Sequence, residues 1–268
     1  MKTRIVTAIL SLPLLIAPIY FGGIILYVMI FLLSVVGTYE LLRAYKVKNK
    51  GIYAIVFIST LSYYLLLWFN WNNYLYLFIT SFLLILLVYY VIAFPKLSFE
   101  TVAITFVAFF YITYLISHII WIRETKDYGF AFVWLVFLIG FGSDTFAYFA
   151  GRLFGKHKLA KELSPKKTIE GSIGGIFGAM LLCILYGYFM YKRGTLEDLS
   201  KLSWLIVMGG VGSILSQAGD LVASAIKRQT GIKDFGKILP GHGGILDRFD
   251  SNFFTAPFVY FIMTLFIN

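Results

Sequence analysis

Side chains that could bind a phosphate and its counter-ion gather in one short segment near the C-terminus. The first group is spaced i, i+4, i+7 and i+8, so a helix would place its members on one face: Asp220, Ser224, Lys227 and Arg228. A second group follows along the chain: Lys233, Asp234, His242, Asp247, Arg248 and Asp250. Carboxylates among cations predict a Mg²⁺ site, because this ion prefers oxygen ligands and bridges substrate phosphates. No cysteine accompanies His242, so zinc is not supported.

The predicted roles divide into metal binding and phosphate binding. The leading metal ligands are Asp220 and Asp247, followed by Asp144 and Asp250. Four basic side chains are predicted to hold phosphates: Lys227, Arg228, Lys233 and Arg248. Ser224 is expected to hydrogen-bond a phosphate or a metal-bound water, and His242 to shape a glycine turn or, as the alternative, to act as a general base. Ion pairing inside a helix bundle would explain Asp220 with Lys227, but not so many polar residues together.

A second polar region lies upstream and contributes further candidates. Asp144, Tyr148 and Arg152 are spaced at i, i+4 and i+8, so they share one face of a predicted helix. The basic, turn-rich loop at 151–171 is predicted to bind triphosphate oxygens through Lys156, Lys166, Lys167 and Thr168. An ordinary basic cytoplasmic loop is the alternative, and the spacing does not match a Walker A loop. The pairs Gly171/Gly175 and Gly174/Gly178 predict close helix packing.

The rest of the chain predicts how these residues are positioned. The 268 residues are 60% hydrophobic and 13% charged, with a mean hydropathy of +0.84, whereas soluble domains carry about a quarter charged residues. Apolar runs long enough to cross a bilayer predict an all-α polytopic membrane protein and exclude a β-barrel. Nine transmembrane helices are predicted, at about 5–21, 24–42, 52–69, 74–94, 99–121, 130–150, 170–191, 202–226 and 251–267.

The distribution of charge predicts the orientation of these helices. The net charge is +10, and with a cytoplasmic N-terminus 18 of the 23 basic residues fall in cytoplasmic segments. This clustering favours anionic lipid and nucleotide phosphates over nucleic acid as partners. We therefore expect a protein of the cell inner (cytoplasmic) membrane with its site facing the cytoplasm. Five helices in residues 1–128 would precede a catalytic region in residues 129–268, and the small-residue pairs would permit a homodimer.

Two ionisable residues outside these regions lie in or near apolar runs. Glu40 and His118 are functional candidates because a charge in lipid is costly. The simpler interpretation is that Glu40 pairs with Arg43 or reaches the membrane surface, and that His118 is a hydrogen-bonded packing residue.

The polar blocks together resemble a known enzyme family. The segments Ser224–Arg228, Lys233–Asp234 and Leu239–Asp250 are similar to the signature of phosphatidate cytidylyltransferases. Upstream, Asp144–Tyr148, Gly151–Arg152, Gly155–Lys156 and Ser164–Gly171 resemble the family's other polar blocks. The resemblance runs from about residue 140 to the end, while the N-terminal half matches only as membrane helices.

The resemblance implies that CTP and phosphatidic acid give CDP-diacylglycerol and pyrophosphate with Mg²⁺, in phospholipid biosynthesis among membrane lipids. A second metal or a monovalent cation is an open alternative. The implied mechanism is in-line attack of the phosphatidate oxygen on the α-phosphorus of CTP, in which charge neutralisation is the main task. A CTP-dependent lipid kinase is the nearest rival. A transporter would instead spread polar residues through several helices.

Overall fold

The computed structural model describes residues 13–196, 198, 201–238, 241 and 243–267. These residues form two compact units. The first contains the described residues up to Ser117 together with Asp234–Leu246, and the second contains His118–Lys233 and Asp247 onward. Every candidate side chain of the predicted site that the structure describes belongs to the second unit, except Asp234. His242 lies outside the described residues.

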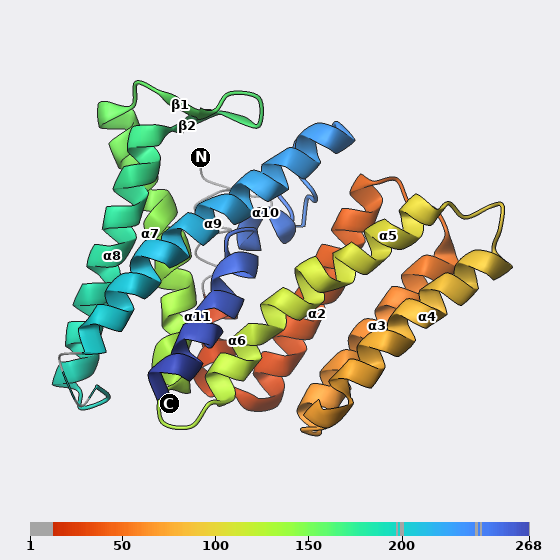
Figure 1. Cartoon of the computed structure of the whole chain (residues 1–268), viewed down its shortest axis with the longest axis horizontal. Coiled ribbons are helices and arrows are strands. Elements are labelled where there is room, and N and C mark those ends of the chain that lie inside the picture. The colour runs from red at the N-terminus through yellow and green to blue at the C-terminus, as the bar shows by residue number, and fades with distance from the viewer. Residues whose placement is uncertain (1–12, 197, 199–200, 239–240, 242, 268) are drawn as a thin grey trace. The chain divides into compact units, whose positions relative to one another are not determined.

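The first unit is built from helices in which each packs against the next in the sequence, and the first of them also packs against the last (Figure 1). After a helical stretch at 13–21, these are α2 (Gly23–Ala44), α3 (Lys50–Trp68), α4 (Leu75–Ile92) and α5 (Phe99–Ala108). Helix α5 continues through a π-helical turn (Phe109–Tyr114) into α6 (Leu115–Glu124), of which only the residues up to Ser117 belong to this unit. Side-chain caps begin two of them: Asn49 accepts from the backbone N–H groups of Gly51 and Ile52, and Ser98 from that of Thr101.

Polar side chains inside the first unit satisfy one another in the membrane-spanning region. The hydroxyl of Tyr64 lies 2.7 Å from Ser34 Oγ and donates to the carbonyl oxygen of Thr113 at 3.3 Å. That carbonyl belongs to the π-helical turn, where the α-helical bonding pattern is interrupted. The hydroxyl of Tyr63 lies 2.8 Å from Ser117 Oγ. These bonds link α2, α3 and the π-helical turn where lipid offers no alternative partner.

The second unit contains α7 (Gly129–Phe154), α8 (Ile169–Lys192), α9 (Leu202–Thr230), the short α10 (Leu246–Phe249) and α11 (Asn252–Ile267).

Glycines let α7 and α8 approach closely, as predicted for the two small-residue pairs. A Cβ added at Gly171 would lie 2.8 Å from the carbonyl oxygen of Ala147, and one at Gly175 would lie 2.9 Å from that of Ser143. Gly174 and Gly178 also face α7, where an added Cβ would overlap the side chains of Ala150 and Phe146. The two backbones are therefore in direct contact.

A β-hairpin connects α7 to α8, where the sequence predicted only a loop. Strands β1 (Lys158–Ala160) and β2 (Ser164–Thr168) pair antiparallel. The Glu170 carboxylate anchors its base by accepting from the backbone N–H groups of Lys156 and His157, with the His157 ring 2.7 Å away. Thr168 caps α8 by accepting from the N–H of Gly171 at 3.1 Å. The hairpin thus gives fixed positions to Lys166 and Lys167.

Seven described helices are long and apolar enough to cross a membrane, and each overlaps one of the predicted spans: Gly23–Ala44, Lys50–Trp68, Asn72–Ile92, Phe99–Glu124, Gly129–Phe154, Ile169–Lys192 and Leu202–Thr230. Residues 5–12 of the first predicted span, at 5–21, lie outside the described residues, and residues 13–21 are helical. The ninth corresponds to α11, which has 16 residues and is shorter than a typical span.

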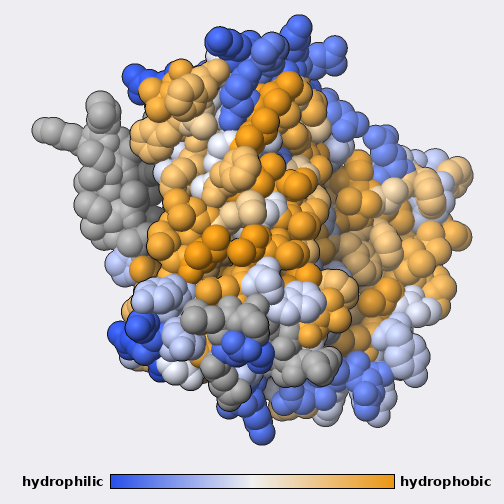
Figure 2. All heavy atoms as spheres, turned by 60° about the vertical axis from the view of Figure 1, so that its left-hand side comes forward, coloured by the Kyte–Doolittle hydropathy of each residue, from blue (hydrophilic) through white to orange (hydrophobic). Residues whose placement is uncertain are grey.

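On the face of the second unit turned forward in Figure 2, a broad apolar band separates hydrophilic residues above and below it.

Candidate active site

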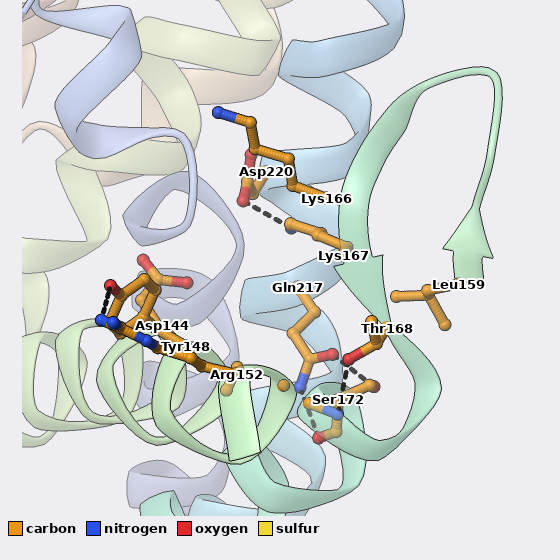
Figure 3. A pocket seen from close by; sticks show the side chains of 13 residues that line it. Asp144, Tyr148, Arg152, Leu159, Lys166, Lys167, Thr168, Ser172, Gln217 and Asp220 are labelled. Atoms are coloured by element: carbon orange, nitrogen blue, oxygen red, sulfur yellow. Dashed lines mark hydrogen bonds and ion pairs between the residues drawn. The ribbon is translucent and has the colours of Figure 1, made fainter. Parts of the chain in front are cut away.

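A pocket of about 390 Å³ opens in the second unit between α7, the hairpin and the start of α8, with α9 as its remaining wall (Figure 3). Its polar lining comes from four elements and includes seven of the predicted site residues: Asp144, Tyr148 and Arg152 from α7, Lys166, Lys167 and Thr168 from β2, and Asp220 from α9. Ser172 from α8 and Gln217 from α9 also line it. Side chains far apart in the sequence thus face one cavity.

The α7 residues lie on one helical face, as their spacing predicted. The helix is continuous from Gly129 to Phe154, so Asp144, Tyr148 and Arg152 all reach the pocket. Arg152 donates from Nη1 to the hydroxyl of Tyr148 at 3.2 Å. This bond directs the guanidinium along the pocket wall, where it can bind an anion bidentately.

Asp220 is the carboxylate that connects α9 to the hairpin. Its Oδ2 forms an ion pair with the ammonium of Lys167 on β2, drawn as a dashed line in Figure 3. Its Oδ1 lies 3.5 Å from Ser224 Oγ, at the long limit of a hydrogen bond. The Asp220 side chain is 27% exposed, so its oxygens remain open to a ligand in the pocket.

Asp247 forms a second ion pair, with Lys227. The ammonium of Lys227 lies 2.9 Å from Asp247 Oδ1. The Asp247 side chain is only 4% exposed and that of Lys227 19%, so the pair is largely removed from water. Because α9 continues to Thr230, Lys227 and Asp220 belong to one helix, as the spacing predicted. Two carboxylates are therefore each held by a lysine of the same unit.

Asp250 lies at the break between α10 and α11, so it does not continue the α10 face that carries Asp247. The N–H of Ser251 donates to Asp250 Oδ1 at 2.8 Å. Burial raises the pKa of Asp250 to about 7, and the neighbouring charges of Asp220 and then Asp144 add to this rise. The three carboxylates are thus close enough to repel one another, which favours a cation among them.

The arrangement of these carboxylates limits the kind of metal site. Among the described residues, no group of three or more Asp, Glu, His or Cys side chains is placed to hold a metal ion. A protein-only cage is therefore not formed by the four predicted ligands. Mg²⁺ needs less, because it is commonly held by one or two carboxylates together with waters and substrate phosphates. The donor chemistry around Asp220 fits such an ion.

The other predicted site residues have varied positions. Arg228 donates from Nε to the carbonyl oxygen of Leu163 at the hairpin turn, at 3.2 Å. Arg248 lies near enough to Asp144 to act on it electrostatically. Lys156 and Lys233 are exposed and do not line the pocket, and the backbone N–H of Lys156 is bound by Glu170. Three predicted cations, Arg152, Lys166 and Lys167, thus line the pocket. Four others lie outside its lining: Lys156, Arg228, Lys233 and Arg248.

Gln217 is a pocket residue to which the sequence analysis assigned no role. Its Nε2 donates to Ser213 Oγ and to the carbonyl oxygen of Ser172, each at 3.2 Å, and its Oε1 accepts from the hydroxyl of Ser172. Ser143 Oγ lies 2.7 Å from Ser213 Oγ. One buried amide therefore joins α7, α8 and α9 beneath Asp220. Its position one helical turn before Asp220 was the available signal.

Replacing Gln217 by Leu is expected to lower the thermal stability of the protein. The change leaves the hydroxyls of Ser172 and Ser213 without their amide partner, at about 1–3 kcal/mol for each buried polar group that stays unsatisfied. The measurement is the unfolding midpoint of the detergent-purified protein. Gln229→Leu on the exposed end of α9 is the matched control, and equal midpoints for the two variants would contradict the role given to this amide.

Comparison with known proteins gives a consistent result across the whole chain. The sequence model of the cytidylyltransferase family matches residues 2–266. A phosphatidate cytidylyltransferase of Bacillus subtilis is 34% identical over 271 residues, covering 99% of this chain and 98% of the relative. Proteins of the same name from Staphylococcus saprophyticus and Staphylococcus epidermidis are 35% and 36% identical, each covering 98% of this chain and 99% of the relative.

Proposed function

The chain belongs to the cytidylyltransferase family, and from this premise we propose that it transfers the cytidylyl group of CTP to phosphatidic acid. The products are CDP-diacylglycerol and pyrophosphate. The enzyme is a nucleotidyltransferase, and the names of relatives that match it over nearly their full length support this particular substrate pair. The predicted resemblance to phosphatidate cytidylyltransferases is confirmed by these relatives.

The observation that carries the proposal is the pocket in which carboxylates and cations face one another on apolar helices. Both substrates are phosphate anions, so bringing them together requires positive charge and exclusion of water. Arg152, Lys166 and Lys167 supply that charge on the pocket walls. The site lies on helices long enough to cross a membrane, α7 and α9, which suits a lipid that stays in the bilayer. A soluble nucleotide can approach the same pocket from the hairpin side.

The residues that line the pocket and the polar residues outside its lining have separate tasks in the proposed reaction. Arg152 and Lys166 bind triphosphate oxygens, and Lys167 passes from its ion pair with Asp220 to a phosphate when substrate arrives. Lys227, Arg228 and Arg248 stabilise charge on the pyrophosphate that leaves. Ser224 donates a hydrogen bond to a phosphate. The lipid phosphate attacks as a dianion, so no protein base is needed to remove a proton from it.

A divalent cation, which we propose to be Mg²⁺, would be held by Asp220 and Asp247, with Asp144 and Asp250 close by. When bound, this ion supplies Lewis-acid stabilisation of the phosphate charge. Asp220 is the carboxylate best placed to share it with substrate, because its side chain borders the pocket and its charge reaches both Asp144 and Asp250. The carboxylates would orient the ion, and their mutual repulsion would be lower with the ion bound.

The placement in the cell follows from the same features. The apolar helices favour an integral protein of the cytoplasmic membrane, and the concentration of basic residues at the ends of α7 and α9 favours a site that faces the cytoplasm. CTP is available on that side. The N-terminus is then cytoplasmic as well.

Product analysis tests the proposal directly. Purified protein in detergent, supplied with phosphatidic acid and CTP labelled on the cytosine, is expected to release pyrophosphate and to place the label in the lipid fraction. Chelation of divalent cations is expected to abolish the product, and added Mg²⁺ to restore it. Release of CDP with unlabelled, newly phosphorylated lipid would instead identify a CTP-dependent lipid kinase, and no lipid-linked cytidine would overturn the proposal.

A further inference from the structure

Glu40 is a buried acidic residue of α2 that the proposed reaction leaves unused. It is 1% exposed within the helix Gly23–Ala44, where a charge needs strong partners. Its two carboxylate oxygens accept from consecutive backbone N–H groups of the same unit, that of Ile245 at 3.2 Å and that of Leu246 at 3.0 Å. Glu40 thus binds the main chain of a segment more than 200 residues later in the sequence.

The packing around this carboxylate explains two glycines of the segment Asp234–Leu246. A Cβ added at Gly236 or at Gly244 would overlap the oxygen atoms of Glu40. Neither glycine has a positive φ, so its backbone conformation alone would admit alanine. The contact with Glu40, rather than the turn geometry, therefore requires glycine at these positions.

A second contact from the same helix holds the other end of the segment. Arg43 donates from Nη2 to the carbonyl oxygen of Phe235 at 2.9 Å. Glu40 and Arg43 are three residues apart, so one turn of α2 binds both ends of the segment, with Phe235 buried beside it. The residue that follows Leu246 is Asp247, and Arg248 comes next.

We propose that Glu40 is a positioning residue for the reaction, which fixes the first residues of α10 and through them Asp247 and Arg248. This inference rests on the proposed function, in which these two side chains act on metal and phosphate. A carboxylate suits the task because it accepts from two parallel N–H groups at once. An amide of the same size would oppose one N–H with its own NH₂ group, so Gln cannot replace Glu here.

The first test compares Glu40→Gln with Glu100→Gln, the same change at an exposed residue of α5. The kcat for CTP, measured per folded protein after size-exclusion chromatography, is expected to fall about 10- to 100-fold for Glu40→Gln, because small displacements of catalytic groups have effects of this size. Binding of Mn²⁺, followed by electron paramagnetic resonance without substrates, is expected to weaken in parallel. A folded Glu40→Gln protein with kcat and Mn²⁺ binding within twofold of wild type would overturn the inference.

The second test uses the contact with Gly244. Gly244→Ala is expected to lower kcat as Glu40→Gln does, because the new methyl group displaces the carboxylate. In the Glu40→Ala background the methyl group has room, so the double variant should be no worse than Glu40→Ala alone. Gly210→Ala is the control, because its new methyl group meets only the Met180 side chain at ordinary contact distance. Its effect on kcat should be the same in the wild-type and Glu40→Ala backgrounds. Multiplicative losses for Glu40→Ala and Gly244→Ala would refute the contact.

The outcomes separate this inference from the proposed function. If wild-type protein forms no lipid-linked cytidine, the function itself fails. If wild type is active and the Glu40 and Gly244 variants behave like their controls, only the positioning role fails. Should Glu40→Ala not fold, Gly244→Ala against Gly210→Ala still decides, because Gly244→Ala keeps the carboxylate.

Discussion

Asp220→Asn is expected to lower kcat/KM for CTP by about 100-fold or more, the usual effect of removing one charged group that stabilises a transition state. The amide keeps the size of the side chain but loses the charge that pairs with Lys167 and that we propose to hold Mg²⁺. Steady-state rates with phosphatidic acid, measured over a range of Mg²⁺ concentrations, check this. The Mg²⁺ concentration for half activity should rise as well.

A matched control is available in the same unit. Asp127→Asn makes the same change at an exposed residue with φ of 65°, a conformation that asparagine tolerates well. Its activity should equal that of wild type. If Asp220→Asn keeps more than a third of the wild-type kcat/KM at all Mg²⁺ concentrations, the role given to Asp220 is wrong.

Lys227→Met is expected to destabilise the protein and to remove most of its activity. The Asp247 side chain is 4% exposed and would lose the ammonium 2.9 Å away, a change that costs about 3 kcal/mol or more when a buried pair is broken on one side. Thermal unfolding in detergent measures the first effect, and product formation the second. Lys126→Met, at an exposed loop position, is the control.

The double variant Lys227→Met with Asp247→Asn separates the two effects. With no charge left to bury, its unfolding midpoint should lie closer to wild type than the sum of the single changes predicts. Activity should stay low, because both side chains are proposed to act on metal and phosphate. Additive stability losses would show that the pair is not coupled, and recovery of activity would exclude a catalytic role for both residues.

The helical parts of the site could be predicted from the sequence because helical spacing is a local property. Asp144, Tyr148 and Arg152 share a face of α7, and Asp220 and Lys227 share α9, for the reason that these helices are long and unbroken. The sequence indicated that α7 and α9 meet at one site only because their polar ends fall on the same predicted cytoplasmic side. Which carboxylates share a metal is still a prediction.

The remaining features depend on contacts that no local pattern announces. The strands of the hairpin are short and carry no alternating apolar pattern, and they are held by Glu170 reaching back to Lys156 and His157. The Glu40 carboxylate binds backbone groups of Ile245 and Leu246, two partners that the sequence did not indicate. A partner so distant in the sequence cannot be inferred from helix periodicity. His118 packs beside the rings of Trp121 and Tyr260, which agrees with its simpler interpretation as a packing residue.

The glycine contacts between α7 and α8 have a consequence for how a lipid can arrive. Near the hairpin, a Cβ added at Gly171 would already lie 3.2 Å from the Cα of Gly151, and one turn deeper Gly175 lies against Ser143 and Ala147. No acyl chain fits through a seam where main chain touches main chain. If the substrate is the proposed diacyl lipid, its route from the bilayer to Asp144 therefore does not lead between α7 and α8 at these two turns.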